Sequence, residues 1–371
     1  MTPRTAAAIS IARPIIGEEE KRQVLEVLES GVLIAGRRVA EFEAAFAAYI
    51  GVPHAVATSS GSSALHVAML ALGIGPGDRV VTTPFTFAAS SNAVIHAGAV
   101  PVFVDVDPET CNLDPGAVED QLRRGGVRAI LVVHLYGLPA DIVTLRSLAD
   151  RYGVLLIEDC AQAHGAASGG RRVGSFGDAA IFSFYPTKNM TTGEGGMLTT
   201  AHPEVARRAR LLVDPRGEAE YAYEVIGFNF RMTEMAGAMG TVQLAALEGR
   251  NRQRREHARR LTEGLRGLSW LSLPVEPDGL HHVYHQYTVR VPQGRGALIA
   301  HLADAGIGAR VYYPSLVTQT PAYRRLSLDG TYPNGLRLTG EVLSLPVHPS
   351  LGEDDLTRIV SAVRAFSGGR P

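Results

Sequence analysis

The sequence has few cysteines, no excess of either charge and no long apolar run. Its only cysteines, Cys111 and Cys160, form no CxxC pair, which excludes a disulfide framework and a cysteine zinc site. The formal net charge of -1 disfavours nucleic acid and anionic lipid as partners. No stretch approaches the roughly 20 apolar residues of a membrane span, and the N-terminus has no signal-type apolar segment. We therefore expect a cytoplasmic protein.

Lysine is also nearly absent. Of the 36 basic residues only Lys21 and Lys188 are lysines, and arginine cannot act as an amine nucleophile because it stays protonated. Lys21 lies in the amphipathic segment GEEEKRQVLEVLES, which predicts the solvated face of a helix. Lys188 lies in SFYPTKNMTTGEGGMLTT, between an apolar β-rich run and a glycine-rich turn. Lys188 is therefore the candidate nucleophile.

Short apolar strands alternate with amphipathic helices in the first two thirds of the chain. The predicted strands are HAVATSS, RVVTTP, VPVFVDVD, RAILVVHLYG, VLLIEDCAQ, DAAIFSFYP and GGMLTT. Predicted helices between them include SALHVAMLALG, FAASSNAVIHAG, GAVEDQLRRG and ADIVTLRSLADRYG. This alternation predicts an α/β fold with a mainly parallel sheet covered by helices on both faces. Ligands of such sheets bind at the carboxyl ends of the strands.

The pattern changes after a long predicted helix that begins near Thr233. Beyond it, the segments HHVYHQYTVRV, ALIAHLADAGI, ARVYYP and EDDLTRIVSAVRAF predict a small α+β domain. We place the boundary near Gly249, which gives a large domain over residues 1–248 and a small C-terminal domain over residues 249–371. The opening helix, around residues 17–30, can pack on either domain.

Several common sites are excluded or disfavoured. Neither lysine has the Gly-Lys-Ser/Thr context of a P-loop, and neither HExxH nor GxSxG occurs. The glycines of LGIGPGD follow a helix instead of a strand, which does not support a dinucleotide site. The HHVYH cluster lies in a strand-like segment whose alternate residues face opposite sides, and no acidic ligand accompanies it. We therefore expect no metal.

Small polar residues open the first predicted helix of the sheet region. Gly61, Ser62 and Ser63 lie between a strand and a helix, where free backbone N–H groups and the helix dipole favour a phosphate. A serine there is also a common N-cap, so the segment alone is ambiguous.

The remaining features suit a ring and an aldehyde. Asp159 ends the apolar run VLLIED, where a buried acid needs a cationic partner such as a protonated pyridine nitrogen. Phe87 follows another strand and offers a flat face for stacking, although an aromatic there is often core. Ser183 ends its own strand, and Lys188 follows it. Together these groups describe pyridoxal 5'-phosphate (PLP) held as a Schiff base on Lys188.

At these residues the sequence strongly resembles the nucleotide-sugar aminotransferases of the DegT and StrS group, which have the type I PLP-dependent aminotransferase fold. The resemblance extends through nearly the whole chain. Its blocks are PIIGEEEKRQVLEVLESG, HLYGLPADI, IEDCAQAHGA, SFYPTKNMTTGEGGM, GFNFRMTEMAGAMG, VYHQYTVRV and LSLPVHPSL.

The resemblance implies a role for each site residue. Lys188 is the internal aldimine lysine, Asp159 pairs with the pyridine nitrogen, Phe87 stacks on the ring, and Gln162 contacts the ring face or its 3-hydroxyl. The phosphate is bound by Ser62, Ser63 and Ser183 and by an asparagine of the neighbouring subunit, which here matches Asn229 of GFNFRM. A homodimer with shared active sites follows.

The resemblance also implies transamination of a nucleotide-linked ketosugar with glutamate as amino donor. Dehydratases of the group have histidine at the lysine position, so Lys188 favours transamination. The TTGEGG segment, Thr191 to Gly196, resembles enzymes that act at the sugar 4-keto position, including perosamine synthase-like enzymes. A 3-ketosugar or aminocyclitol ketone acceptor, and a regulator without turnover, remain as alternatives.

Two segments depart from the family pattern. LLVDPRGEAEY lacks the histidine that relatives carry before the Asn-x-Arg motif, which leaves the substrate contacts of that loop open. Ser62 and Ser63 replace a common Thr-Ala pair, a mild change because the backbone N–H groups and one hydroxyl are kept.

Overall fold

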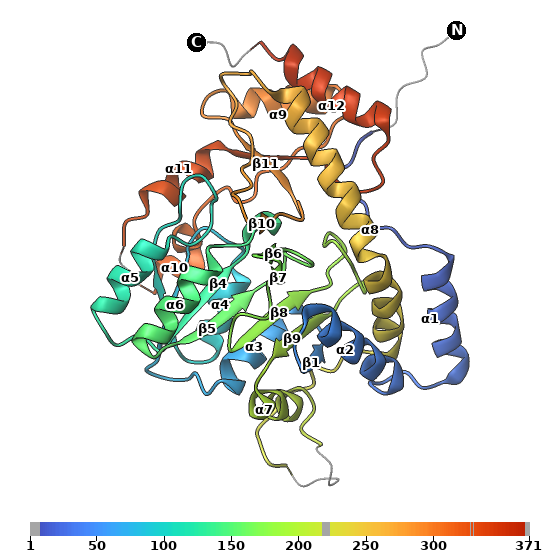
Figure 1. Ribbon diagram of the computed structural model, residues 1–371, viewed down its shortest axis with the longest axis vertical. Helices are drawn as coiled ribbons and strands as arrows, with labels where there is room; N and C mark the ends of the chain where they lie inside the picture. Colours follow the sequence, from blue (N-terminus) through green and yellow to red (C-terminus); the bar gives the residue numbers. More distant parts are fainter. Residues whose placement is uncertain (1–7, 217–222, 327, 329, 368–371) are drawn as a thin grey trace.

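The computed structural model describes residues 8–216, 223–326, 328 and 330–367. Its central sheet has seven strands: β1 (His54–Thr58), β2 (Arg79–Thr82), β3 (Val100–Phe103), β4 (Ala129–Val133), β5 (Leu155–Asp159), β8 (Ala179–Ser183) and β9 (Gly196–Thr200). They lie in the order β1-β9-β8-β5-β4-β2-β3, of which Figure 1 labels the first five. Within this sheet β9 runs against the other strands, which are parallel. The seven strands coincide with the seven predicted segments, and the α/β class is confirmed.

The helices are α1 (Glu18–Ser30), α2 (Arg37–Ile50), α3 (Gly61–Ala71), α4 (Ala89–His96), α5 (Pro115–Arg123), α6 (Ile142–Tyr152), α7 (Pro203–Val213), α8 (Glu234–Leu265), α9 (Arg295–Asp304), α10 (Pro321–Arg324), α11 (Pro333–Glu341) and α12 (Glu353–Ala365). Successive strand residues face opposite sides of the sheet. Leu131 and Ile157 therefore pack with α3, α4 and α7, whereas Val132 and Leu156 pack with α5 and α6. Near β1 and β9 the second face is covered by α2 and α8.

The C-terminal third of the chain builds a separate apolar cluster. Strands β11 (Tyr287–Arg290) and β12 (Val342–Leu345) pair antiparallel, and α9, α12 and the end of α8 pack around them. A third, small sheet contains β6 (Ala167–Ser168), β7 (Arg171–Arg172) and β10 (Leu280–His281).

The long helix α8 links the two regions. Figure 1 shows α8 running from the region of the seven-stranded sheet to the C-terminal region. Leu244 and Leu247 in its first half join the cluster under the seven-stranded sheet, and Leu261 and Leu265 in its second half join the C-terminal cluster. The predicted domain boundary near Gly249 therefore lies inside a continuous helix and stays a prediction. The opening helix α1 packs against α8.

The parallel strands direct their carboxyl ends to one edge of the sheet, and the loops that follow β1, β2, β5 and β8 meet there. Edges of this kind hold the ligands of open α/β sheets. No helix in the part of the chain that the structure describes combines the length and the apolar composition needed to cross a bilayer.

Candidate active site

A cavity of about 700 Å³ opens at this edge of the sheet. Six of the predicted site residues line it together: Ser62, Phe87, Asp159, Gln162, Ser183 and Lys188. They come from four different loops and strand ends, so the fold brings together residues that are more than 120 positions apart at the extremes. Ser63 and Asn229 do not line it.

Lys188 lies in the connection between β8 and β9 and lines the cavity, where it keeps part of its surface open. The surrounding protein otherwise desolvates the amine. This burial lowers the pKa of Lys188 from 10.5 to about 8, although the nearby Asp159 carboxylate acts in the opposite direction. At pH 7.5 roughly a quarter of such amines are neutral, against about one in a thousand for an ordinary lysine. The neutral amine is the nucleophilic form.

Asp159 is the last residue of β5 and is 4% exposed. Its Oδ2 accepts a hydrogen bond from Ser90 Oγ at 2.7 Å, and its Oδ1 accepts one from the backbone N–H of Ala161 at 3.0 Å. Burial nevertheless raises the pKa of Asp159 above its usual value. A cation placed in the cavity beside this carboxylate would keep it ionised.

Phe87 and Gln162 line the cavity together with Asp159. The Phe87 ring is 61% exposed although it lines a cavity, so it is available for stacking and is not a core residue. The Gln162 side chain is held at both ends. Its Oε1 accepts from the backbone N–H of Tyr136 at 2.7 Å, and its Nε2 donates to the Tyr313 hydroxyl at 3.0 Å.

The start of α3 forms the polar end of the cavity. Ser60 is the N-cap, and its hydroxyl accepts from the backbone N–H of Ser63 at 3.1 Å. The backbone N–H groups of Gly61 and Ser62 belong to the first turn of α3, where N–H groups have no partner within the helix. A helix N-terminus of this kind favours an anion. The helix lies very close to the end of β8, because a Cβ on Gly61 would be 2.7 Å from the Ser183 Cβ.

Two predicted phosphate ligands, Ser63 and Asn229, do not line the cavity of their own chain. The Ser63 hydroxyl bonds to the hydroxyls of Ser59 and Ser60, so it supports the helix start and does not line the cavity. Asn229 is exposed, although the carbonyl of its neighbour Phe230 accepts a hydrogen bond from the Ser59 N–H at 2.6 Å. Of the departing segment LLVDPRGEAEY, residues 217–221 lie outside the described residues.

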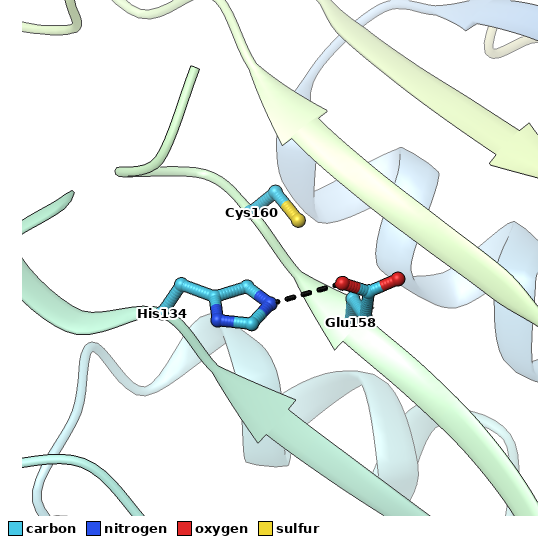
Figure 2. A group of neighbouring side chains, drawn as sticks. All are labelled: His134, Glu158 and Cys160. Carbon is cyan, nitrogen blue, oxygen red and sulfur yellow. Dashed lines mark hydrogen bonds and ion pairs between the residues drawn. The ribbon is translucent and has the colours of Figure 1, made fainter. Parts of the chain in front are cut away.

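Figure 2 shows the one group of three potential metal ligands found among the described residues: His134, Glu158 and Cys160. Its polar atoms are already used. His134 Nδ1 accepts from the Ala140 N–H at 3.0 Å, so its Nε2 donates to Glu158 at 3.1 Å. The Glu158 carboxylate also accepts three backbone N–H groups, from Gly174, Phe176 and Gly177. The group therefore ties strands together and offers a metal no free carboxylate lone pair of good geometry.

Several side chains of the site are not predicted from the sequence. Ser90 bonds to Asp159, Tyr313 bonds to Gln162, and His285 and Arg310 line the cavity. Arg310 brings a second cation to the cavity and is exposed there. Only Ser90 had a local signal, because it follows the same strand end as Phe87. The other three come from the C-terminal region, whose placement over the sheet edge no local pattern reveals.

The cavity therefore combines an amine, a buried acid, an exposed aromatic face and a helix N-terminus. These groups fit a planar aromatic cation with an aldehyde and an anionic tail, each at a separate position. The deep acid and the close approach of Gly61 to Ser183 are features that packing alone does not require.

Several known proteins are similar to this chain over nearly its whole length. It is 41% identical over 351 residues to the dTDP-3-amino-3,4,6-trideoxy-alpha-D-glucose transaminase of Streptomyces venezuelae, covering 94% of this chain and 92% of that protein. It is 38% identical over 377 residues to the GDP-perosamine synthase of Caulobacter vibrioides, covering 96% and 97%. It is also 40% identical over 354 residues to a pleiotropic regulatory protein of Geobacillus stearothermophilus, covering 94% of each.

A solved structure has the same fold. The crystal structure of S. venezuelae DesV in complex with a ketimine intermediate superimposes with a TM-score of 0.90 at 41% identity, covering 93% of each chain. Residues 14–364 match the DegT/DnrJ/EryC1/StrS aminotransferase family. The resemblance found in the sequence is thus confirmed, and the chain belongs to the DegT/DnrJ/EryC1/StrS aminotransferase family.

Proposed function

We propose that this protein is a PLP-dependent aminotransferase that converts a nucleotide-linked ketosugar to an aminosugar nucleotide, with glutamate as amino donor. The observation that carries the proposal is that Lys188 and Asp159 line the same cavity. The amine has a lowered pKa, and the acid lies buried at the end of a central strand. The named transaminase relatives support the same activity.

The residues of the cavity would hold the cofactor at both ends. Asp159 would bind its ring nitrogen, Phe87 would stack on its ring, and Gln162 would contact the ring or its 3-hydroxyl. Its phosphate would lie against the N–H groups at the start of α3 and the hydroxyls of Ser62 and Ser183.

Bound PLP supplies an aldehyde that condenses with amines and a ring that accepts the electron pair released when a substrate C–H bond breaks. Lys188 then has two tasks. Its neutral amine would hold the cofactor, and the free amine would move a proton at the substrate carbon. Asp159 would keep the ring nitrogen protonated, because a negative carboxylate stabilises a positive charge beside it.

We infer a 4-keto-6-deoxyhexose as acceptor. The TTGEGG segment supports this acceptor, because it resembles that of enzymes acting at the sugar 4-keto position and its Glu194 lines the cavity. The perosamine synthase relative is consistent with this choice, whereas the Streptomyces relative is named for a 3-amino sugar. A 3-ketosugar or aminocyclitol ketone is therefore the alternative acceptor. The regulatory name of the Geobacillus relative favours, as a second candidate, a regulator that keeps the fold.

The test is to load the purified protein with PLP, reduce it with borohydride and map the adduct by mass spectrometry. We expect the adduct on Lys188, and its absence from cofactor-loaded protein or its presence elsewhere would overturn the proposal. Cofactor absorbance is then followed while amino donors and nucleotide ketosugars are added in turn. A regulator would show the adduct without either half-reaction, and the panel of ketones separates the 4-keto from the 3-keto acceptor.

A further inference from the structure

One residue of the histidine-rich segment HHVYH, which the proposed function does not use, lines the cavity, and it also lines a small neighbouring cavity of about 20 Å³. His285 is 7% exposed, precedes β11 and lines the cavity together with Lys188. Its two ring nitrogens have different surroundings. Nδ1 lies 3.3 Å from Asn189 Oδ1, whereas Nε2 makes no hydrogen bond with the described residues and is not enclosed by them.

A row of side-chain amides fixes which nitrogen of His285 carries the proton. Asn251 of α8 donates its Nδ2 to the His164 carbonyl at 2.8 Å, so its Oδ1 must face the other way. That oxygen accepts from Asn189 Nδ2 at 2.9 Å, and the same Nδ2 donates to the Val283 carbonyl at 3.2 Å. Both N–H groups of Asn189 are thus used.

The orientation of Asn189 then determines the tautomer of His285. Turning the Asn189 amide over would place its oxygen against two acceptors, the Asn251 oxygen and the Val283 carbonyl. Asn189 Oδ1 therefore faces His285, and only an N–H can lie opposite it. His285 Nδ1 is the donor.

The ring is also neutral. Burial lowers the pKa of His285 well below 6.5, and the positive charges of Lys188 and Arg254 act in the same direction. A neutral imidazole that is protonated on Nδ1 has an unshared electron pair on Nε2. His285 thus presents a hydrogen-bond acceptor without charge, in a cavity whose Asp159 and Gln162 oxygens already accept hydrogen bonds from the protein.

We propose that His285 is a substrate-binding residue whose Nε2 accepts a hydrogen bond from an O–H or N–H group of the ligand. The inference rests on the proposed function for the nature of that ligand. Two substrates carry such a donor, the hydroxyls of the ketosugar and the amino group of the donor amino acid, and kinetics with each varied in turn separates them.

Two substitutions divide the functions of the two nitrogens. His285→Asn keeps an N–H near the Nδ1 position for Asn189 but has no atom at the Nε2 position. His285→Gln loses the bond to Asn189 but carries an acceptor oxygen near the Nε2 position. We expect His285→Asn to raise the KM of one substrate about tenfold, as for one lost hydrogen bond, and His285→Gln to change it less than about threefold. His281→Asn, outside the cavity, is the control and should leave both KM values unchanged.

Equal effects of the two substitutions, or unchanged KM values in both, would overturn the inference, because the ring would then serve only packing.

A measurement on the unsubstituted protein is independent of folding defects. Nitrogen-15 NMR of histidine-labelled protein should show His285 as the neutral tautomer protonated on Nδ1, and an Nε2–H tautomer would refute the proposal. Borohydride mapping of the adduct on Lys188 in the same samples tests the proposed function separately. A failure of the His285 inference can therefore be told apart from a failure of the proposed function.

Discussion

One hydroxyl and one backbone N–H hold the Asp159 carboxylate at the end of β5. Neither bond supplies positive charge, and burial alone works against ionisation of this group. The residue is therefore built to receive a cation from a ligand. A buried acid kept only for stability would instead form an ion pair with an arginine or lysine of the protein. Among the described residues Asp159 forms no such ion pair, and Lys188 favours its ionisation only from beyond ion-pair distance.

Asp159→Asn should keep the size of the side chain and remove its charge, so that PLP binds but its ring nitrogen is no longer kept protonated. We expect turnover to fall by about three powers of ten, on the order of 4 kcal/mol at about 1.4 kcal/mol per tenfold. Single-turnover kinetics of the glutamate half-reaction measures it. Ser90→Ala, which removes one hydrogen bond but no charge, is the matched control and should lose far less. Near-normal turnover of Asp159→Asn would show that another carboxylate serves the ring.

At the scale of elements, the contact between α3 and β8 shapes the proposed phosphate end of the cavity. A side chain at Gly61 would meet the Ser183 Cβ at 2.7 Å, a distance that carbon atoms of neighbouring side chains do not tolerate. The helix can approach the strand end this closely only because residue 61 is glycine.

Gly61→Ala should push the start of α3 away from Ser183. We expect a loss of stability of about 1–3 kcal/mol from overpacking and at least a tenfold weaker affinity for PLP. Urea unfolding of the apo-protein and titration with PLP measure the two effects. Gly340→Ala is the control, because that helical glycine has open space around it and alanine is the better helix former. If Gly61→Ala binds PLP normally, α3 does not form the phosphate end.

The elements show where sequence reasoning succeeds and where it ends. Each predicted strand is apolar and bounded by polar or glycine-containing turns, so all seven were found from local pattern. The antiparallel direction of β9 was not predicted. The connection from β8 to β9, residues 184–195, contains no helix, whereas a parallel neighbour is usually reached through a crossover helix. Helix α2 was missed although Val39, Phe42 and Phe46 carry a helical apolar period.

The site residues likewise divide into those that have a local sequence signal and those that do not. Lysine scarcity and strand ends identified Lys188 and Asp159, because both signals are local. The hydrogen-bond partners of the site residues cannot be predicted from the sequence. Ser90 lies 69 positions from Asp159, and Tyr313 lies 151 positions from Gln162. The Ser90 contact depends on which strand ends lie together at the sheet edge, and the Tyr313 contact depends on how the C-terminal region lies over that edge. No pattern within a segment reveals either arrangement.

At the scale of the whole molecule, the predicted phosphate ligand Asn229 lies outside the cavity of its own chain. Asn229 is exposed and does not line the cavity, while its segment runs along the loop before α3. An amide donates hydrogen bonds to a phosphate without adding charge, which suits a residue contributed by a neighbouring subunit. We predict that Asn229 acts across a dimer interface.

Mixing two inactive proteins tests this prediction. Asn229→Ala and Lys188→Ala chains are combined under conditions that exchange subunits, after each is shown to fold. If Asn229 acts in the neighbouring site, each heterodimer contains one site with both natural residues, and activity returns to about a quarter of the natural specific activity in an equal mixture because half of the dimers carry one working site. If it acts in its own chain, no site combines both residues and the mixture stays inactive. Each protein mixed with itself is the control.

Acid sensitivity is a second property of the whole molecule, because several histidines are buried without charge. Burial lowers the pKa of His164 and of His282 to about 3, and that of His348 to about 4. In the unfolded chain each titrates near 6.5, so below that pH the unfolded state binds more protons and stability falls as the pH falls. The loss begins below pH 6.5 and ends near pH 3 to 4, where the folded-state groups also protonate.

We expect these three groups together to cost about 4 kcal/mol of unfolding free energy between pH 7.5 and pH 5.5, because each group loses about 1.4 kcal/mol for each pH unit below its unfolded-state pKa of about 6.5 and little above it. Urea unfolding of the apo-protein at the two pH values measures the loss. His164→Leu should reduce it by about a third, since the His164 ring nitrogens make no hydrogen bond of normal geometry and only the nearby Ser183 backbone favours their protonation. His202→Leu, at an exposed position, is the control and should keep the whole loss. A stability that stays flat over this interval, where carboxylates are still ionised, would mean that the buried rings accept protons without unfolding.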